Sequence, residues 1–555
     1  METRDVQRTE DGLKVRTVGS ALPKTDDAGR PVIAAVVNNM VVPLATPLIG
    51  APEMRPLTRA DAYGFEVDRH SLVFMLAKCA NELFPKATFR VRHSVGAALW
   101  CSLTTPSDAT GETPPPTPQE IVARLRPAME ALRAADLPIV AEAVPYGEAV
   151  ALFTGLGRRD ELNLLRHRNP PLVQLSRCGD FRALNQTPLA PRTGAVGPYE
   201  LVPVDDGLVL NVSTAENPDV VEPLPYVAPY FSVFRRQCAR TAITGVETIG
   251  DLNQVIHERR FDVFVRTVEA LQTKELSGIA DQIAARKPAA RLVLIAGPSS
   301  AGKTTTAHRL CTQLRVNGLK PLLLSTDDYF VGDARNPRDE NGALDYETVE
   351  AVDAPRLAAD LNALFAGKPV RLRRFDFLKH DGYDAAAETR LDADGVVVLE
   401  GIHALNPRLT RDIPNDLKFR LYLNALTQLV LDTCNRLSAT DTRLLRRLVR
   451  DFNFRGMSPL RTFELWPGVV AGERRWIYPY QAQADAVFNS SLDYELAVLK
   501  PYATQLLNQV KPWDAAYVEA RRLSGILHNV SQAKADAVPG DSILRETIGG
   551  SQLDY

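Results

Sequence analysis

Residues 297–304 constrain the fold of this 555-residue chain more than any other segment. They read GPSSAGKT and match the pattern GxxxxGK(S/T). An apolar run (291–296) precedes this segment, and a helix-forming run with Ala307, Leu310 and Leu314 on one side follows it. A glycine-rich loop between a strand and a helix directs backbone N–H groups at an anion, which the helix dipole also favours. The pattern therefore predicts a strand, a phosphate-binding loop and a helix, in that order.

The loop also predicts contacts to a nucleotide. Lys303 can reach the β- and γ-phosphates, and the Thr304 hydroxyl can bind Mg²⁺. A simple glycine turn would require neither residue at its position. We expect the nucleotide to contact Gly297, Pro298, Ser299, Ser300, Ala301, Gly302, Lys303, Thr304 and Thr305.

Apolar runs alternate with helical segments after Pro288. The runs are RLVLIA (291–296), PLLLS (321–325), VVVLE (396–400) and FRLYLN (419–424). This alternation is typical of a parallel α/β sheet flanked by helices. Apolar residues at helical spacing also predict an amphipathic helix from Phe261 to Leu271 and a further helix beyond Asp493.

Five motifs follow the loop in order: LLLSTDDYF (322–330), ALDYETVEAVD (343–353), RRFDFLKHDGY (373–383), VVVLEGIHALN (396–406) and DTRLLRRLVRDFNFRG (441–456). Together they resemble the uridine–cytidine kinase and phosphoribulokinase group of P-loop kinases. The resemblance implies a P-loop kinase fold and a transferase that uses ATP and Mg²⁺ to phosphorylate a hydroxyl group.

The resemblance also assigns roles to acidic residues. Asp327, the first of an acidic pair at a strand end, is the expected general base, because a carboxylate there lies where the hydroxyl nucleophile loses its proton. Glu400 joins Thr304 and Asp327 as the expected Mg²⁺ ligands. The alternatives are an exposed carboxylate for Glu400 and helix capping for the acidic pair, and we expect the capping role for Asp328.

An arginine-rich segment is the expected lid. Arg447 and Arg450 are three residues apart on one helical face, and Arg455 follows at the helix end. By resemblance they close over the transferring phosphoryl group and exclude water. An arginine run alone is more typical of a solvated face. With Lys303 and Asp327, these arginines are the predicted catalytic residues.

The acceptor is predicted from the same resemblance. Asp345 matches a carboxylate that binds ribose hydroxyls, and Phe375, Phe377 and His380 lie in the segment that holds the base in pyrimidine nucleoside kinases. Phe375 replaces a frequent tyrosine and Gly382 a common arginine, so the base stays open. The predicted acceptor is the 5′-hydroxyl of a uridine- or cytidine-like nucleoside.

The N-terminal half resembles other proteins. VIAAVVNNMVVPL (32–44), with a predicted turn at Asn38-Asn39, resembles a TGS-type β-grasp module. DRHSLVFMLAKCANELFP (68–85) resembles the editing-side domain of threonyl-tRNA synthetases, which carries an HxxxH metal pair. Here Phe74 stands four residues after His70, so we expect no zinc site.

With the two halves in this order, the chain resembles a bacterial family of long uridine-kinase-like nucleoside kinases that have a synthetase-like N-terminus. This resemblance predicts five parts: a TGS-like β-grasp module (1–60), a synthetase-like α+β domain (61–245), a helical connector (246–287), the P-loop kinase domain (288–500) and a helical extension (501–555).

Composition limits the location and partners of the protein. Six scattered cysteines without a CxxC pair fit free thiols in a reducing compartment. The charged N-terminus lacks a signal-peptide core, and prolines interrupt the apolar stretch between Pro31 and Pro52, so we expect a cytoplasmic protein without a membrane partner. A formal charge of −2 gives no support to RNA binding through the N-terminal half. A homo-oligomer is compatible with the sequence.

Two alternatives to a nucleoside kinase remain open at this point. One is a kinase for another sugar or polyol acceptor on the same scaffold. The other is a nucleotide-gated RNA-binding regulatory protein. The complete set of base, metal and lid residues favours catalysis.

Overall fold

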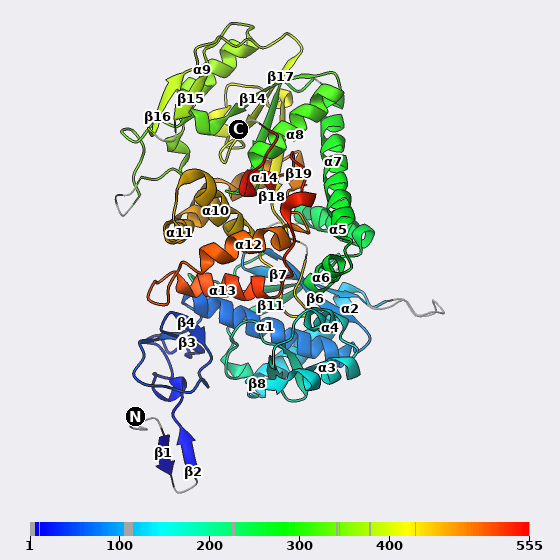
Figure 1. Ribbon diagram of the computed structural model, residues 1–555, viewed down its shortest axis with the longest axis vertical. Coiled ribbons are helices and arrows are strands. Elements are labelled where there is room, and N and C mark those ends of the chain that lie inside the picture. The colour runs from blue at the N-terminus through cyan, green and yellow to red at the C-terminus, as the bar shows by residue number, and fades with distance from the viewer. Residues whose placement is uncertain are drawn as a thin grey trace.

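The computed structural model describes residues 6–9, 12–104, 115–205, 207–224, 228–287, 289–339, 342, 344–376, 379–427 and 429–553. Its N-terminal elements lie at one end of the long axis, and the parallel sheet that carries the phosphate loop lies at the other end (Figure 1). In the described helices, no segment is both long and apolar enough to cross a membrane.

Two small antiparallel sheets come first in the chain. β1 (Val6–Thr9) and β2 (Gly12–Val15) form a hairpin, and β3 (Ala34–Val37), β4 (Met40–Val42) and β5 (Met54–Leu57) form a sheet in the order β4-β3-β5. The predicted turn at Asn38 and Asn39 joins β3 to β4. Both residues have positive φ, 47° and 57°, which asparagine tolerates better than most residues.

Two helices cover a four-stranded antiparallel sheet next. The helices are α1 (Ala62–Leu83) and α2 (Pro118–Ala134). The sheet has the order β11-β12-β7-β6, with β6 (Thr88–Val95), β7 (Ala98–Thr104), β11 (Tyr199–Val204) and β12 (Gly207–Val212). Thr117 and Glu120 form a capping box at the start of α2. These elements share one apolar core, to which α1 contributes most of its length.

A second three-stranded sheet and a group of helices lead to the parallel sheet. The strands are ordered β10-β9-β8, with β8 (Val140–Pro145), β9 (Leu172–Cys178) and β10 (Phe181–Leu184). The helices are α3 (Tyr146–Gly155), α4 (Arg159–Arg166), α5 (Ala228–Thr244), α6 (Ile249–His257) and α7 (Phe261–Ala285). The predicted amphipathic helix is confirmed as part of α7, which buries Phe264, Val265 and Val268.

Five parallel strands form the sheet that carries the phosphate loop, in the order β14-β17-β13-β18-β19. They are β13 (Leu292–Ala296), β14 (Lys320–Ser325), β17 (Gly395–Glu400), β18 (Lys418–Asn424) and β19 (Ala486–Asn489). Four of them were predicted. β19 was not predicted, because AVFN is too short an apolar run to stand out.

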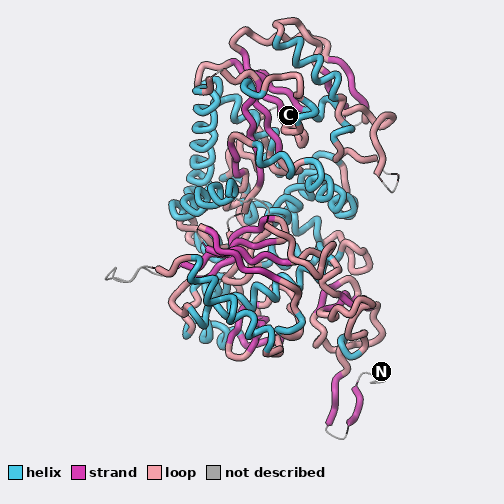
Figure 2. Tube along the Cα trace, turned by 180° about the vertical axis from the view of Figure 1, so that it is seen from behind, coloured by secondary structure: helices cyan, strands magenta, loops and turns pink. Residues whose placement is uncertain are grey.

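Helices cover both faces of this sheet, so the inner strands β13 and β17 are buried throughout, whereas the edge strands β14 and β19 are partly exposed. Val293 and Ile295 face a core shared with α7 and α8 (Lys303–Val316), whereas Leu292 and Leu294 face a core shared with α9 (Ala354–Phe365). A hairpin of β15 (Arg373–Asp376) and β16 (Asp381–Asp384) lies apart from the sheet. Figure 2 shows the strands from behind.

The remaining helices connect the two ends of the molecule. They are α10 (Ala439–Arg455), α11 (Pro459–Trp476), α12 (Glu495–Leu507), α13 (Tyr517–His528) and α14 (Arg545–Ile548). α12 and α13 lie between the parallel sheet and the N-terminal elements (Figure 1). One apolar core includes residues of α3, α7, the parallel sheet and α13, so the five predicted parts do not each have a separate core, and their boundaries stay a prediction.

Candidate active site

The phosphate loop joins the carboxyl end of β13 to α8, so the predicted strand–loop–helix arrangement is confirmed. Gly302 is left-handed, with a φ of 79°, and Lys303 begins the helix. Gly297 also has to be glycine, because a Cβ there would lie 2.4 Å from the carbonyl oxygen of Leu423. The Lys303 ammonium donates to the Pro298 carbonyl at 3.2 Å and so folds back over the loop.

Acidic side chains lie beside the loop, because parallel strands bring their carboxyl ends to one edge. Glu400 ends β17, and its Oε1 accepts hydrogen bonds from Ser325 Oγ (2.8 Å) and Thr304 Oγ1 (3.3 Å). Asp327 lies in a 3₁₀ turn directly after β14. Burial and the charge of Asp327 raise the pKa of Glu400 to about 7.

This cluster is suited to a divalent cation. Thr304, Asp327 and Glu400 offer the hard oxygen ligands that Mg²⁺ prefers. The raised pKa of Glu400 means that its negative charge is unfavourable in the protein alone, and a cation would offset that cost. Among the described residues, no three His, Cys, Asp or Glu side chains form a metal-binding group. Further ligands would therefore come from phosphates and water.

Asp328 faces away from this cluster, toward β15. Its Oδ2 accepts from Arg374 Nη1 at 2.9 Å, and its Oδ1 accepts from the backbone N–H of Phe375 at 3.4 Å. The prediction that Asp328 caps a helix was therefore wrong, because a neighbouring hairpin supplies its partners. The side chain holds that hairpin against the carboxyl end of β14.

The three predicted lid arginines meet at one carboxylate on α10, Asp451, which is 0% exposed. Arg447 Nε lies 3.1 Å from its Oδ2, while Arg450 Nη2 and Arg455 Nε lie 2.7 and 3.8 Å from its Oδ1. Arg447 Nη1 also donates to Ser299 Oγ of the phosphate loop at 2.9 Å. The charge of Arg450 is the main cause that lowers the pKa of Arg455 to about 10. Three cations around one carboxylate leave an excess of positive charge beside the loop.

Four further residues of this contact, which form two ion pairs, were not predicted. Arg443 forms a buried ion pair with Glu473 of α11 and donates to the Ser299 carbonyl at 2.8 Å. Glu473 in turn accepts from the Ser299 N–H at 2.9 Å. Arg446 pairs with Glu495 at 2.5 Å. The arginine-rich segment was a signal for this contact, but it did not show which arginines are buried or what they bind.

The predicted acceptor residues are only partly brought together. The Asp345 carboxylate accepts from the Glu347 N–H at 2.9 Å. His380 lies 3.3 Å from the Tyr346 hydroxyl. Phe375 is 8% exposed and packs edge-on against Phe330, with 5.6 Å between ring centroids, so it belongs to the apolar core. Phe377 lies outside the described residues.

Two further titratable groups, Glu347 and His403, were not predicted. Glu347 is close to the charges of Arg447 and Lys303, and burial raises its pKa to about 7. Burial lowers the pKa of His403 to about 4, so its ring is neutral at pH 7. His403 lies within the motif VVVLEGIHALN, whose spacing alone did not single it out.

Comparisons with known proteins agree with this geometry. Residues 292–497 match the model of the phosphoribulokinase/uridine kinase family. A uridine kinase of Deinococcus deserti is 32% identical over 165 residues, which cover 30% of this chain and 70% of that enzyme. The chain belongs to this family. A uridine kinase of Lactobacillus helveticus is 27% identical over 221 residues, 39% of this chain and 96% of that enzyme.

Membership of the phosphoribulokinase/uridine kinase family makes the protein an ATP-dependent kinase with a small-molecule acceptor. The N-terminal part has a different relative. Threonine–tRNA ligase of Syntrophotalea carbinolica is 30% identical over 175 residues, which are 32% of this chain and 26% of the ligase. The predicted synthetase-like N-terminal part is thereby confirmed as a likeness, and the chain spans about a quarter of that ligase.

His70 and His93 of the N-terminal half have different neighbours. His70 Nδ1 lies 2.7 Å from the Glu66 carbonyl of its own helix. His93 stacks on Trp100, with 6.0 Å between ring centroids. Phe74, at the position where a second histidine would complete HxxxH, packs against Phe181. The expected lack of zinc here stays a prediction.

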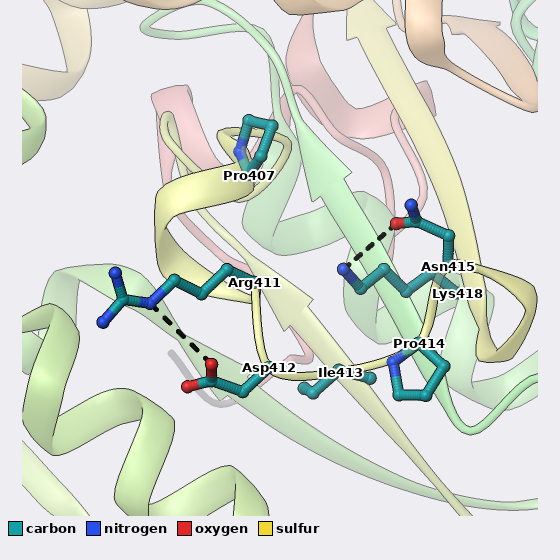
Figure 3. A pocket seen from close by; sticks show the side chains of 7 residues that line it. All are labelled: Pro407, Arg411, Asp412, Ile413, Pro414, Asn415 and Lys418. Atoms are coloured by element: carbon teal, nitrogen blue, oxygen red, sulfur yellow. Dashed lines mark hydrogen bonds and ion pairs between the residues drawn. The ribbon is translucent and has the colours of Figure 1, made fainter.

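The pocket in Figure 3 does not belong to the kinase site. It has a volume of about 480 Å³ and is lined by Pro407, Arg411, Asp412, Ile413, Pro414, Asn415 and Lys418. Lys418 begins β18, so the pocket lies at the amino end of a strand in the parallel sheet. The phosphate loop, Ser325 and Glu400 lie at the carboxyl ends.

Proposed function

We propose that this kinase transfers the γ-phosphoryl group of ATP to the 5′-hydroxyl of a uridine- or cytidine-like ribonucleoside. The proposal rests on one observation: three features lie together at one edge of the sheet. They are Lys303, the hydrogen bond between Thr304 and Glu400, and the three arginines around Asp451. Together they combine phosphate binding, a divalent-cation site and a source of positive charge.

Each residue has a physical role in this proposal. The loop N–H groups and Lys303 bind the phosphates, and Asp327 accepts the proton of the attacking hydroxyl. Thr304, Asp327 and Glu400 would hold Mg²⁺, which neutralises phosphate charge when bound. Arg447, Arg450 and Arg455 stabilise the charge of the group in transfer and help to exclude water.

The ribonucleoside acceptor rests on Asp345, whose family counterpart binds ribose hydroxyls. A buried polar group that loses its hydrogen-bond partner costs about 1–3 kcal/mol, so a missing hydroxyl should be strongly selected against. Because Phe375 packs in the core, His380 and the neighbouring Tyr346 are the polar candidates to contact the base. We therefore expect weaker selection of the base than of the sugar.

A panel of acceptors tests the proposal. The full-length chain with ATP and Mg²⁺ is given uridine, cytidine, inosine, 2′-deoxyuridine, simple sugars and polyols, or tRNA, and both ADP and the phosphorylated product are measured. Uridine and cytidine should give 5′-monophosphates with the highest kcat/KM, and 2′-deoxyuridine should be at least about tenfold poorer. Turnover only with sugars or polyols, or only a tRNA-dependent release of ADP, would replace this proposal by one of the alternatives.

A further inference from the structure

A segment near the end of the described chain packs against the kinase core, although it follows the residues that match the family model. Ser542 and Leu544 are fully buried, and Ser542 Oγ lies 3.1 Å from the Tyr494 hydroxyl. The guanidinium of Arg545 donates to the carbonyl groups of Ala535, Val538, Pro539 and Gly549. We call residues 542–549 the C-terminal segment.

The C-terminal segment contacts the phosphate loop at two points. Ile543, 2% exposed, packs against Gly302, and its Cγ2 lies 2.3 Å from the position that a Cβ on that glycine would take. Glu546 Oε2 accepts a hydrogen bond from Thr305 Oγ1 at 2.8 Å. The segment also contacts α10, because Asn453 Nδ2 donates to the Thr547 carbonyl at 3.3 Å.

Glu546 places a negative charge where the phosphate loop would bind an anionic ligand. Thr305 lies in the first turn of α8, where N–H groups and the helix dipole favour an anionic ligand. Glu546 places a carboxylate on that turn. It faces the same lysine as Glu400 and Asp327, since all three carboxylates favour the charged form of Lys303. Glu400 and Asp327 belong to the proposed cation site. Glu546 instead binds Thr305, the residue after Thr304, and has no role in the proposed transfer.

We propose that Glu546 is a determinant of nucleotide affinity, a negative charge that the C-terminal segment holds at the phosphate loop and that weakens binding in proportion to the charge of the nucleotide's phosphates. Like charges a few ångströms apart repel even in the partly solvated surroundings of a loop. The same charge speeds the release of ADP, because repulsion that weakens binding acts mainly on the dissociation rate.

Nucleotide binding to the full-length protein tests this proposal without any acceptor, so a wrong acceptor assignment would leave the result unchanged. Isothermal titration with ATP, ADP and adenosine in the presence of a chelator is compared between wild type and Glu546→Gln, which keeps an acceptor for Thr305 but removes the charge. Glu464→Gln is the matched control, because Glu464 is exposed and pairs only with Arg461 among the described residues. Thermal melting establishes that each variant is folded.

The expected result is binding at least about threefold tighter for ADP, a larger gain for ATP and no change for adenosine. Glu546→Ala should show the same order, while Glu546→Asp and Glu464→Gln should bind like wild type. Unchanged affinity for ATP and ADP in both charge-removing variants would overturn the proposal. Weaker binding of all three ligands would overturn it as well, since Glu546 would then support the nucleoside directly.

Discussion

Lys303 is held in an arrangement that suits a phosphate ligand. Burial lowers its pKa, while Glu400 and Asp327 oppose that effect, and its ammonium binds only a loop carbonyl among the described contacts. An incoming phosphate would give this half-buried ammonium a directly bound anion, in place of the carboxylates that act on it from further away. The Lys303 ammonium is therefore free to contribute binding energy to the reacting phosphates rather than to a contact within the protein.

Lys303→Ala should nearly abolish phosphoryl transfer and leave the fold intact. The loop geometry depends on Gly297 and Gly302 rather than on the lysine side chain. ADP release together with circular dichroism measures both effects. A variant with wild-type turnover would contradict the role of the loop in the kinase.

Asp327→Asn should lower kcat by at least about 10²-fold with ATP binding largely kept, because it removes a base while the loop still binds the phosphates. Asp328→Asn is the matched control, since Asp328 binds Arg374 and the β15 backbone instead. We expect a smaller loss of kcat from the control. A larger loss from Asp328→Asn would reverse the assignment within the pair.

At the scale of elements, α10 acts as a rigid carrier of arginines. Arg443 and Arg446 fix it to α11 and α12 through buried ion pairs and to the phosphate loop through hydrogen bonds to the carbonyls of Ser299 and Ser300. Arg447, Arg450 and Arg455 meet at Asp451 on the same helix. The helix is thus already docked on the loop, and Asp451 sets where its arginines point.

Asp451→Asn should lower kcat by about tenfold or more, because the three arginines lose the charge that orients them. It should also raise the ratio of ADP formed to phosphorylated product, since the arginines help to exclude water. Asp441→Asn is the matched control on α10, because Asp441 pairs with Arg522 of α13, at 2.6 Å, away from the loop. The control should lose stability without a change in that ratio. Equal ratios in both variants would remove Asp451 from this role.

At the scale of the whole molecule, the segment before α10 is inserted into the N-terminal half. The Ile249 N–H donates to the Val430 carbonyl, and Asn435 Nδ2 donates to the Leu184 carbonyl. Glu161 of α4 lies beside Asp432 of this segment, and both are buried. Burial is the main cause that raises both carboxyl pKa values, that of Asp432 to about 7. The charge of Glu161 raises the pKa of Asp432 further, and the charge of Asp160 adds to the rise of the Glu161 pKa.

This buried pair should make folding less stable as pH rises. Between about pH 4, where these groups ionise in the unfolded chain, and about pH 7, the folded state retains protons that the unfolded state has lost, so the free energy of unfolding falls. Because Glu161→Gln removes one of the two carboxyl groups, the free energy of unfolding of this variant should fall less with rising pH. We expect its free energy of unfolding relative to wild type to rise by at least about 1 kcal/mol from pH 4.5 to pH 8. Denaturant titrations at several pH values measure this difference, and the Glu464→Gln variant should show none.

Much of the fold could be predicted from local patterns. GPSSAGKT set the β13–loop–α8 unit, and apolar runs marked four of the five parallel strands. Asp327, Glu400 and the lid arginines could be placed near the loop, because they follow strand ends or share a helix face. Phe375 could not be assigned correctly, since an aromatic side chain fits a core and a base-binding site equally well in a sequence.

Residue order alone determined the family, the parallel sheet and the residues expected at its carboxyl edge, because strand, turn and helix signals act over a few positions. The tertiary structure decided which charges meet there. Thr305 and Glu546 are 241 positions apart, and Ser299 and Glu473 are 174 apart. No local pattern pairs such residues, because their contact depends on how buried faces pack and which ion pairs that packing encloses.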